Sequence, residues 1–225
     1  MSKDLASKID HTLLKADATE LELTRLCQEA KEFGFATVCV NSSRVAFCAK
    51  LLKKLKAKSK AIAVIGFPLG AMSTAAKVFE TKQAVKDGAA EIDMVLAIGQ
   101  LKDKNFDYVL NDIRKVVKAA GRKKVKVILE TALLDAEEKR IACSLAQEAG
   151  ATFVKTCTGF GGGGASVEDL QLMRATVGTT MLVKASGGIR THADAIKMIG
   201  AGADRIGASA SVAIVKQEKA SGAGY

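Results

Sequence analysis

The chain has 225 residues, of which 48 % are hydrophobic and 26 % charged, and its formal net charge is +10. This length and balance predict a single domain with a large core. No uninterrupted apolar run approaches the roughly 18 residues of a membrane span, and the N-terminus lacks a basic start followed by a long apolar stretch. These features argue against membrane and secreted proteins, so we expect a cytoplasmic one.

The cysteines and histidines do not have the spacing of a metal site. Only His11 and His192 are available, and no two cysteines form a C-x-x-C pair. The odd set of cysteines predicts reduced thiols, and we expect no metal or other cofactor. These cysteines are Cys27, Cys39, Cys48, Cys143 and Cys157.

The positive charge is densest at residues 50–60 and 121–126, and charge alone would permit binding to nucleic acid. In the first block, however, the lysines alternate with leucines at helical spacing, as on a solvated face over a buried one. Aromatic residues make up only 4 % of the chain, which leaves few platforms for stacking bases. We therefore expect no nucleic-acid or membrane partner, and a small anionic substrate instead.

Short apolar runs alternate with longer amphipathic stretches along the chain, which is typical of repeated βα units. Between the strands lie helical patterns such as 18–34, 106–121 and 135–150, the last with Asp135 as its N-cap and Gly150 at its end. The predicted strands are 9–12, 37–40, 61–67, 91–97, 125–131, 152–158, 181–186 and 205–209. Eight such units, with no G-x-G-x-x-G after the first strand, favour an α/β fold of the (β/α)8 TIM-barrel type over a doubly wound sheet, in one domain covering 1–225.

Two lysines stand inside apolar strands, Lys155 in the segment 152–160 and Lys184 in the segment 181–188, and each precedes glycines. A single lysine at a strand end usually extends its charge to solvent. Here Asp93 lies in a third apolar strand, and such a cluster favours a functional site. Burial and a neighbouring cation lower a lysine pKa from about 10.4, and the resulting free amine forms Schiff bases with carbonyl compounds. The three residues therefore predict carbonyl chemistry.

In a barrel of this kind the active site lies at the carboxyl ends of the strands. The chemically capable residues at these ends are Asp10, Cys39, Asp93, Glu130, Lys155 and Lys184. Gly187 and Gly188 follow the seventh strand and would let backbone N–H groups approach a phosphate. The glycine-rich segment 159–166 would add donors, act as a mobile lid or serve as a flexible connection.

Seven segments, in order over nearly the whole chain, carry a resemblance to a known family. They are IDHTLLK, VIGFPLGA, EIDMV, ETALLDAEEK, FVKTCTGF, KASGGIRT and RIGAS. These resemble the successive motifs of the deoxyribose-phosphate aldolases. The resemblance implies a metal-free Schiff-base aldolase on a (β/α)8 barrel. Such an enzyme reversibly cleaves 2-deoxy-D-ribose 5-phosphate to D-glyceraldehyde 3-phosphate and acetaldehyde.

The resemblance also implies roles for single residues. Lys155 would be the Schiff-base nucleophile, Lys184 the cation that keeps Lys155 deprotonated, and Asp93 part of the proton relay. Asp10 is a supporting candidate. Cys39 matches a pocket cysteine of the family, although a small core side chain is the favoured interpretation. The phosphate group would be bound at Gly159, Gly187, Gly188, Gly207 and Ser209, with Arg190 nearby.

The C-terminal segment 216–225 loses the βα pattern and predicts a flexible tail. By resemblance, its last residue, Tyr225, would reach the pocket and assist proton transfer. Two alternatives remain open from the sequence: another lysine-dependent barrel aldolase or transaldolase, and a non-catalytic binding relative. The substrates would be small phosphorylated sugars and aldehydes, and the expected assembly is a homo-oligomer, most simply a dimer.

Overall fold

The computed structural model describes residues 2–218, with side chains from Asp4 onward. Tyr225, and with it most of the predicted tail, lies outside the described residues. The last helix extends to Lys216, one residue into that predicted tail. Among residues 2–218, no helix is long and apolar enough to cross a membrane.

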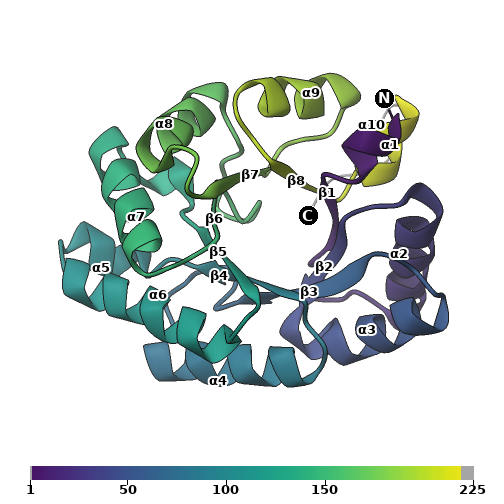
Figure 1. Cartoon of the computed structure of the whole chain (residues 1–225), viewed down its shortest axis with the longest axis horizontal. Coiled ribbons are helices and arrows are strands. Elements are labelled where there is room, and N and C mark those ends of the chain that lie inside the picture. The colour runs from purple at the N-terminus through teal and green to yellow at the C-terminus, as the bar shows by residue number, and fades with distance from the viewer. Residues whose placement is uncertain (1, 219–225) are drawn as a thin grey trace.

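Eight parallel strands form a closed barrel in sequence order, with β8 pairing back to β1 (Figure 1). The barrel prediction is therefore confirmed. The strands are β1 (Ile9–Leu13), β2 (Thr37–Asn41), β3 (Lys60–Ile65), β4 (Glu91–Val95), β5 (Lys124–Ile128), β6 (Phe153–Lys155), β7 (Leu182–Ser186) and β8 (Arg205–Ala208). Lys155 and Lys184 are register partners on β6 and β7, so the two lysines stand at one level of the barrel.

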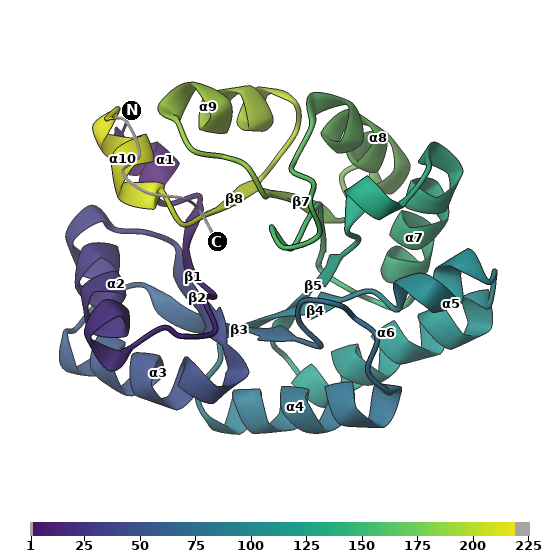
Figure 2. The same ribbon diagram turned by 180° about the vertical axis from the view of Figure 1, so that it is seen from behind.

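The helices form a ring outside the barrel, as both views of the ribbon show (Figures 1 and 2). They are α1 (Ser2–Ala6), α2 (Glu20–Phe33), α3 (Val45–Lys54), α4 (Thr74–Lys86), α5 (Ile98–Lys102), α6 (Phe106–Ala120), α7 (Ala136–Glu148), α8 (Val167–Val177), α9 (His192–Gly200) and α10 (Ser211–Lys216). Short 3-10 turns, η1 (Ser42–Arg44) and η2 (Thr131–Leu133), follow β2 and β5.

Local signals explain where the helices begin and end. Asp135 caps α7 through a capping box with Glu138, as its position in the sequence predicts. Gly34 ends α2 with φ +72°, a left-handed conformation that glycine adopts without steric cost. Five predicted strands extend beyond the observed carboxyl ends, because β3 stops at Ile65, β4 at Val95, β5 at Ile128, β6 at Lys155 and β8 at Ala208. Just beyond these ends the backbone still makes single hydrogen bonds to the neighbouring strand, such as Leu129 N to Lys155 O at 2.9 Å and Thr156 N to Lys184 O at 3.1 Å, before the chain enters the loops.

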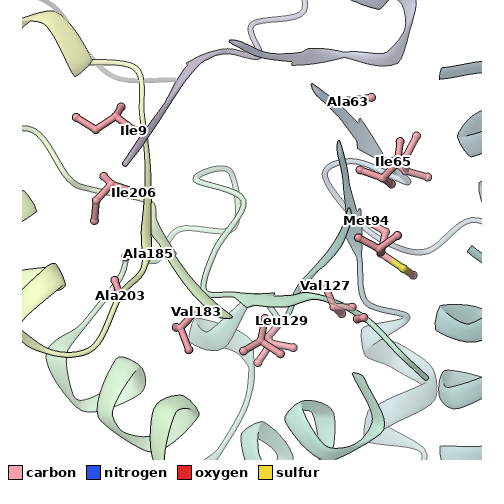
Figure 3. Close-up of a cluster of buried hydrophobic side chains, with 14 of the residues drawn as sticks. Ile9, Ala63, Ile65, Met94, Val127, Leu129, Val183, Ala185, Ala203 and Ile206 are labelled. Atoms are coloured by element: carbon pink, nitrogen blue, oxygen red, sulfur yellow. The ribbon is translucent and has the colours of Figure 1, made fainter. Parts of the chain in front are cut away.

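The two faces of the strands have different partners. Outward-facing side chains such as Ile65, Met94, Val127 and Val183 pack towards the helices and form the main core (Figure 3). Inside the barrel, a smaller apolar cluster of Leu14, Cys39, Ile62 and Val64, with Phe67 packed against it, covers the wall made by β1, β2 and β3. The remaining interior positions are occupied mainly by buried charged groups. The barrel thus separates an apolar outer core from a polar interior.

Candidate active site

The carboxylate of Asp93 lies at the centre of the charged interior. It is fully buried on β4 and accepts hydrogen bonds from three lysines. Its Oδ1 accepts from Lys126 Nζ at 2.7 Å, and its Oδ2 accepts from Lys184 Nζ at 2.8 Å and from Lys155 Nζ at 3.1 Å. The structure thus brings together the three residues that the sequence singles out, and it adds Lys126.

A second buried carboxylate, Asp10 on β1, holds Lys184 from the other side. Lys184 Nζ lies 2.5 Å from Asp10 Oδ2, whereas Asp10 Oδ1 accepts from Arg205 at 2.6 Å and from the Thr37 hydroxyl at 2.7 Å. Lys184 is therefore fixed between two carboxylates. Lys155 has a single carboxylate contact, and it is longer than the contacts that Lys126 and Lys184 make with Asp93.

Glu91 completes the arrangement below Asp93. Its Oε2 lies 2.5 Å from Lys126 Nζ and 3.5 Å from the Arg205 guanidinium. We call the joined set the barrel network. It consists of Asp10, Glu91, Asp93, Lys126, Lys155, Lys184 and Arg205.

The two lysines of the predicted pair have opposite pKa shifts. Burial and the positive charge of Lys184 lower the pKa of Lys155, and the single contact with Asp93 does not reverse this. Burial also opposes the charge on Lys184, but Asp10 and Asp93 raise its pKa above the ordinary value. The structure therefore distinguishes a persistent cation, Lys184, from an amine that loses its proton more easily, Lys155.

The charges of the barrel network balance when Lys155 is neutral. Burial disfavours ionised carboxylates, yet the neighbouring cations hold the pKa of Asp93 and of Asp10 well below the usual range. Burial likewise opposes the charge on Lys126, but Asp93 and Asp10 raise its pKa. With Glu91, three carboxylates then face three cations, Lys126, Lys184 and Arg205. A fourth cation at Lys155 would be uncompensated in a buried site, which is costly.

Sequence reasoning missed Lys126, Glu91 and Arg205. Lys126 belongs both to the basic block 121–126 and to the predicted strand 125–131, and its side chain is fully buried. One signal was present: Lys126 lies between Val125 and Val127, and side chains alternate between the two faces of a strand. Because both faces of a barrel strand are buried, that alternation places Lys126 inside the barrel.

Cys39 contributes a small apolar surface to the site. It is fully buried in the interior cluster with Leu14, Ile62 and Val64. Burial raises the pKa of the Cys39 thiol to about 11, so it is a protonated thiol at neutral pH. This agrees with the favoured interpretation of Cys39 as a small core side chain.

The glycine-rich segment after β6 packs closely against neighbouring loops. A Cβ on Gly161 would lie 2.8 Å from Glu130 Cδ, and one on Gly164 would lie 3.0 Å from the Gly187 carbonyl oxygen. The Thr158 hydroxyl donates to Glu130, and Ala165 N donates to Gly187 O at 3.0 Å. These glycines therefore allow close contact between the loops after β5, β6 and β7.

The predicted phosphate residues occupy different environments. Gly159, Gly187 and Gly188 have φ values of +88°, +92° and +74°, which favour glycine at the mouth of the barrel. Ser209 and Arg190 are exposed after β8 and β7, respectively. Gly207 is buried within β8. A Cβ at Gly207 would lie 2.9 Å from Lys184 Cε and 3.0 Å from Ser186 Cβ, so this glycine makes room for the lysine.

The positions of Gly207 and Ser209 predict different roles for the two residues, Gly207 in placing Lys184 and Ser209 in binding phosphate. Gly207→Ala should displace the Lys184 side chain and lower kcat by about 10- to 100-fold, because small misplacements of reacting groups are costly. Ser209→Ala should instead raise KM for a phosphorylated substrate and leave kcat nearly unchanged. Steady-state kinetics of the two variants provides the measurement. A Gly207→Ala enzyme with wild-type kcat and raised KM would favour the phosphate role for Gly207.

Comparison with known proteins places this geometry in a family. The family model described as DeoC/LacD family aldolase matches residues 5–219. The chain belongs to this aldolase family. A deoxyribose-phosphate aldolase of Halalkalibacterium halodurans is 56 % identical over 223 residues, covering 99 % of each chain. One of Thermococcus gammatolerans is 57 % identical, covering 95 % of this chain and 96 % of that protein.

A solved structure of the same family supports the fold in detail. The deoxyribose-phosphate aldolase of Aeropyrum pernix superposes with a TM-score of 0.89 at 35 % identity, covering 96 % of this chain and 91 % of that chain. That structure is described as a unique tetramer. Within residues 2–218 of the present chain, no group of three or more His, Cys, Asp or Glu residues is arranged to hold a metal ion.

Proposed function

We propose that this aldolase reversibly cleaves 2-deoxy-D-ribose 5-phosphate to D-glyceraldehyde 3-phosphate and acetaldehyde through a Schiff base on Lys155, without a metal ion. The observation that carries the proposal is the different setting of the two buried lysines. Lys184 lies between the carboxylates of Asp10 and Asp93, which raise its pKa, whereas Lys155 has a single, longer contact with Asp93, and burial and Lys184 lower its pKa. A free amine and a fixed cation in one buried site are what iminium chemistry requires.

The reaction begins when the Lys155 lone pair attacks the aldehyde carbon, C1, of the open-chain sugar phosphate. The carbinolamine loses water to give an iminium, and this requires a proton for the departing hydroxyl. Lys184 holds its proton beside Asp93, which contacts both lysines, so these two groups are placed to supply and return protons.

Carbon–carbon cleavage then uses the iminium as an electron sink. The C3 hydroxyl loses its proton, the C2–C3 electron pair moves towards the iminium, and D-glyceraldehyde 3-phosphate departs as an aldehyde. The remaining enamine is protonated at C2, and water hydrolyses the new iminium. Acetaldehyde is released and Lys155 returns to the free amine.

The phosphate end of the substrate would bind at the loops after β6, β7 and β8, where Gly159, Gly187, Gly188 and Ser209 lie at the barrel mouth. The apolar wall that contains Cys39 would face the carbon chain near C1 and C2. Tyr225 and Asp10 remain supporting candidates, Tyr225 for proton transfer at C2 and Asp10 through its hold on Lys184. We further propose a cytoplasmic location and a homo-oligomeric assembly, most simply a dimer.

Borohydride trapping tests the proposed function directly. With 2-deoxy-D-ribose 5-phosphate and sodium borohydride, we expect a reduced adduct on Lys155 and on no other lysine, located by peptide mass mapping. EDTA should leave turnover unchanged. An adduct on Lys184 would overturn the assignment of roles, and a loss of activity with EDTA that a divalent ion restores would indicate metal-assisted polarisation of the carbonyl group. Trapping by other aldehydes but not by this sugar would favour a different lysine-dependent aldolase or a transaldolase.

A further inference from the structure

A second buried ion pair lies outside the barrel, between α4 and α6. Lys77 Nζ is 2.7 Å from Asp112 Oδ2, and both side chains are nearly inaccessible, at 0 % and 1 % exposure. The Thr74 hydroxyl donates to Asp112 Oδ1 at 2.7 Å. Among the described residues, the side chains of this pair make no hydrogen bond or ion pair with a member of the barrel network, so the proposed chemistry does not use it directly.

The Lys77 ammonium also donates a hydrogen bond to the strand that carries the central carboxylate, β4. Its Nζ donates to the backbone carbonyl oxygen of Val95 at 3.0 Å. Val95 is the last residue of β4 and lies two positions after Asp93. The buried ammonium thereby ties the carboxyl end of β4 to α4 and, through Asp112, to α6.

The stem of Lys77 also supports the loop after β3. A Cβ at Gly66 would lie 3.1 Å from Lys77 Cε and 3.4 Å from Lys77 Cγ, so the backbone at Gly66 rests on the lysine stem. One turn along α4, Glu80 accepts from Gly66 N at 2.9 Å and from the Ser42 hydroxyl at 2.7 Å. One face of α4 therefore holds the loop after β3 and the start of the turn after β2.

This loop leads directly into the apolar wall of the site. Phe67, next to Gly66, packs against the interior cluster that contains Cys39. The Phe67 ring also meets Phe160 of the glycine-rich segment edge-on, with ring centroids 5.2 Å apart. Movement of Gly66 would therefore be passed to the aromatic pair formed by the loops after β3 and β6.

Stability alone gives a weak reason for an ion pair at this position. Desolvation of two buried charges offsets much of their attraction, and well-packed apolar residues of similar volume often serve equally well. What an apolar pair lacks is a donor for the Val95 carbonyl oxygen and a directed contact between two helices and a strand end.

We propose that the Lys77–Asp112 pair is a positioning element for the active site. Through Val95 it fixes the position of Asp93 along the barrel axis, and through Gly66 it fixes the position of Phe67. The inference rests on the proposed function, because it assigns Asp93 to the proton relay. Lys77 and Asp112 are positioning residues, and neither would touch the substrate.

The test replaces the pair as a unit, so that no buried charge is left without a partner. Lys77→Met/Asp112→Leu should fold, with a melting temperature close to that of the wild type. Its kcat should fall by about 10- to 100-fold, because a displaced relay group loses its alignment with the substrate. KM should rise less than kcat falls, since the contact of Phe67 with Phe160 reaches only the loop after β6, whereas the proposed phosphate site also uses the loops after β7 and β8.

A matched control is available on the neighbouring helices. Lys139 of α7 and Asp169 of α8 also form an interhelical ion pair at 2.6 Å, with 15 % and 14 % of their side chains exposed. Within residues 2–218, neither side chain donates or accepts a hydrogen bond at a strand end. Lys139→Met/Asp169→Leu should therefore retain the wild-type kcat. A second variant, Lys77→Met/Asp112→Asn, keeps an acceptor for Thr74 and removes the donor to Val95, so it reports on the same contact if the first variant fails to fold.

The outcomes separate the inference from the function on which it rests. If wild-type Lys155 traps the sugar phosphate and a folded Lys77 variant retains full kcat, the positioning role is wrong and the proposed function stands. Equal losses of kcat in the Lys77 and Lys139 variants would also overturn the inference, because any interhelical pair would then have the same effect. Failure of the wild type to trap at Lys155 would refute the proposed function itself.

Discussion

Lys184→Met is expected to lower kcat/KM at neutral pH by about 10²- to 10⁴-fold and to move the rising limb of the pH–rate profile to higher pH. The wild-type barrel network balances three carboxylates with three cations while Lys155 is neutral. Without Lys184, two cations would face three carboxylates, so Lys155 would take up the missing proton. Its pKa would rise, and each unit lowers the fraction of free amine at neutral pH about tenfold.

The measurement is kcat/KM against pH for the variant and the wild type, together with the rate of borohydride trapping at Lys155. Trapping in the variant should recover as the pH is raised above the new pKa. Lys102→Met is a suitable control, because this lysine is 44 % exposed and pairs only with Glu138 among the ion pairs of the described residues. A residual rate with an unchanged profile would mean that Lys184 does not act through the charge of Lys155. Because the groups are coupled, the shift is a property of the whole site.

Asp93→Asn is expected to move the rising limb of the pH–rate profile to lower pH, opposite to the effect of Lys184→Met. The amide removes one negative charge, so three cations would face two carboxylates and protonation of Lys155 would become harder. The limb should therefore shift to lower pH. We nevertheless expect kcat to fall by about 10²- to 10⁴-fold, because the acid–base group that contacts both lysines is lost. A shift to higher pH in this variant would contradict the charge balance on which both predictions depend.

The same substitution should lower the free energy of unfolding by about 3–5 kcal/mol, because three buried lysines lose their shared carboxylate. The pKa of Asp93 is depressed in the folded protein, so its contribution to stability is complete above the unfolded pKa of about 4 and is lost as the pH falls through the folded value. The stability difference between variant and wild type should shrink towards acid pH. Denaturant unfolding at neutral and acid pH provides the check.

Much of the fold follows from local patterns that the sequence carries. Helix signals such as the Asp135 cap and the glycine that ends α2 depend on neighbours within a few residues, and the structure confirms them. The alternation of apolar strands with amphipathic helices likewise predicts the barrel. Strand ends were predicted less well, because several predicted strands continue past the residues at which the strands end, among them Ile65, Val95, Ile128 and Lys155.

Part of the site was also predictable. Lys155, Lys184 and Asp93 stand out because burying a charged side chain in an apolar strand costs free energy unless the charge is paired. A charged residue within an apolar run can be recognised from the sequence alone. Their partners are not visible in this way. Asp10 and Lys184 are 174 residues apart in the sequence yet 2.5 Å apart in space, and only closure of the barrel, in which β8 pairs with both β1 and β7, brings them together.

The sequence by itself determined the barrel and the identity of the two central lysines, whereas the tertiary structure decided what each charged group does. Lys126 and Arg205 lie in predicted strands, but only the register of the closed barrel places them beside Asp93 and Glu91. From the sequence, Gly207 is predicted to bind phosphate in a loop, whereas in the structure it lies within β8 and packs against Lys184. The physical reason is that a pKa depends on charges and burial in three dimensions, and these are set by strands that meet across the closed barrel.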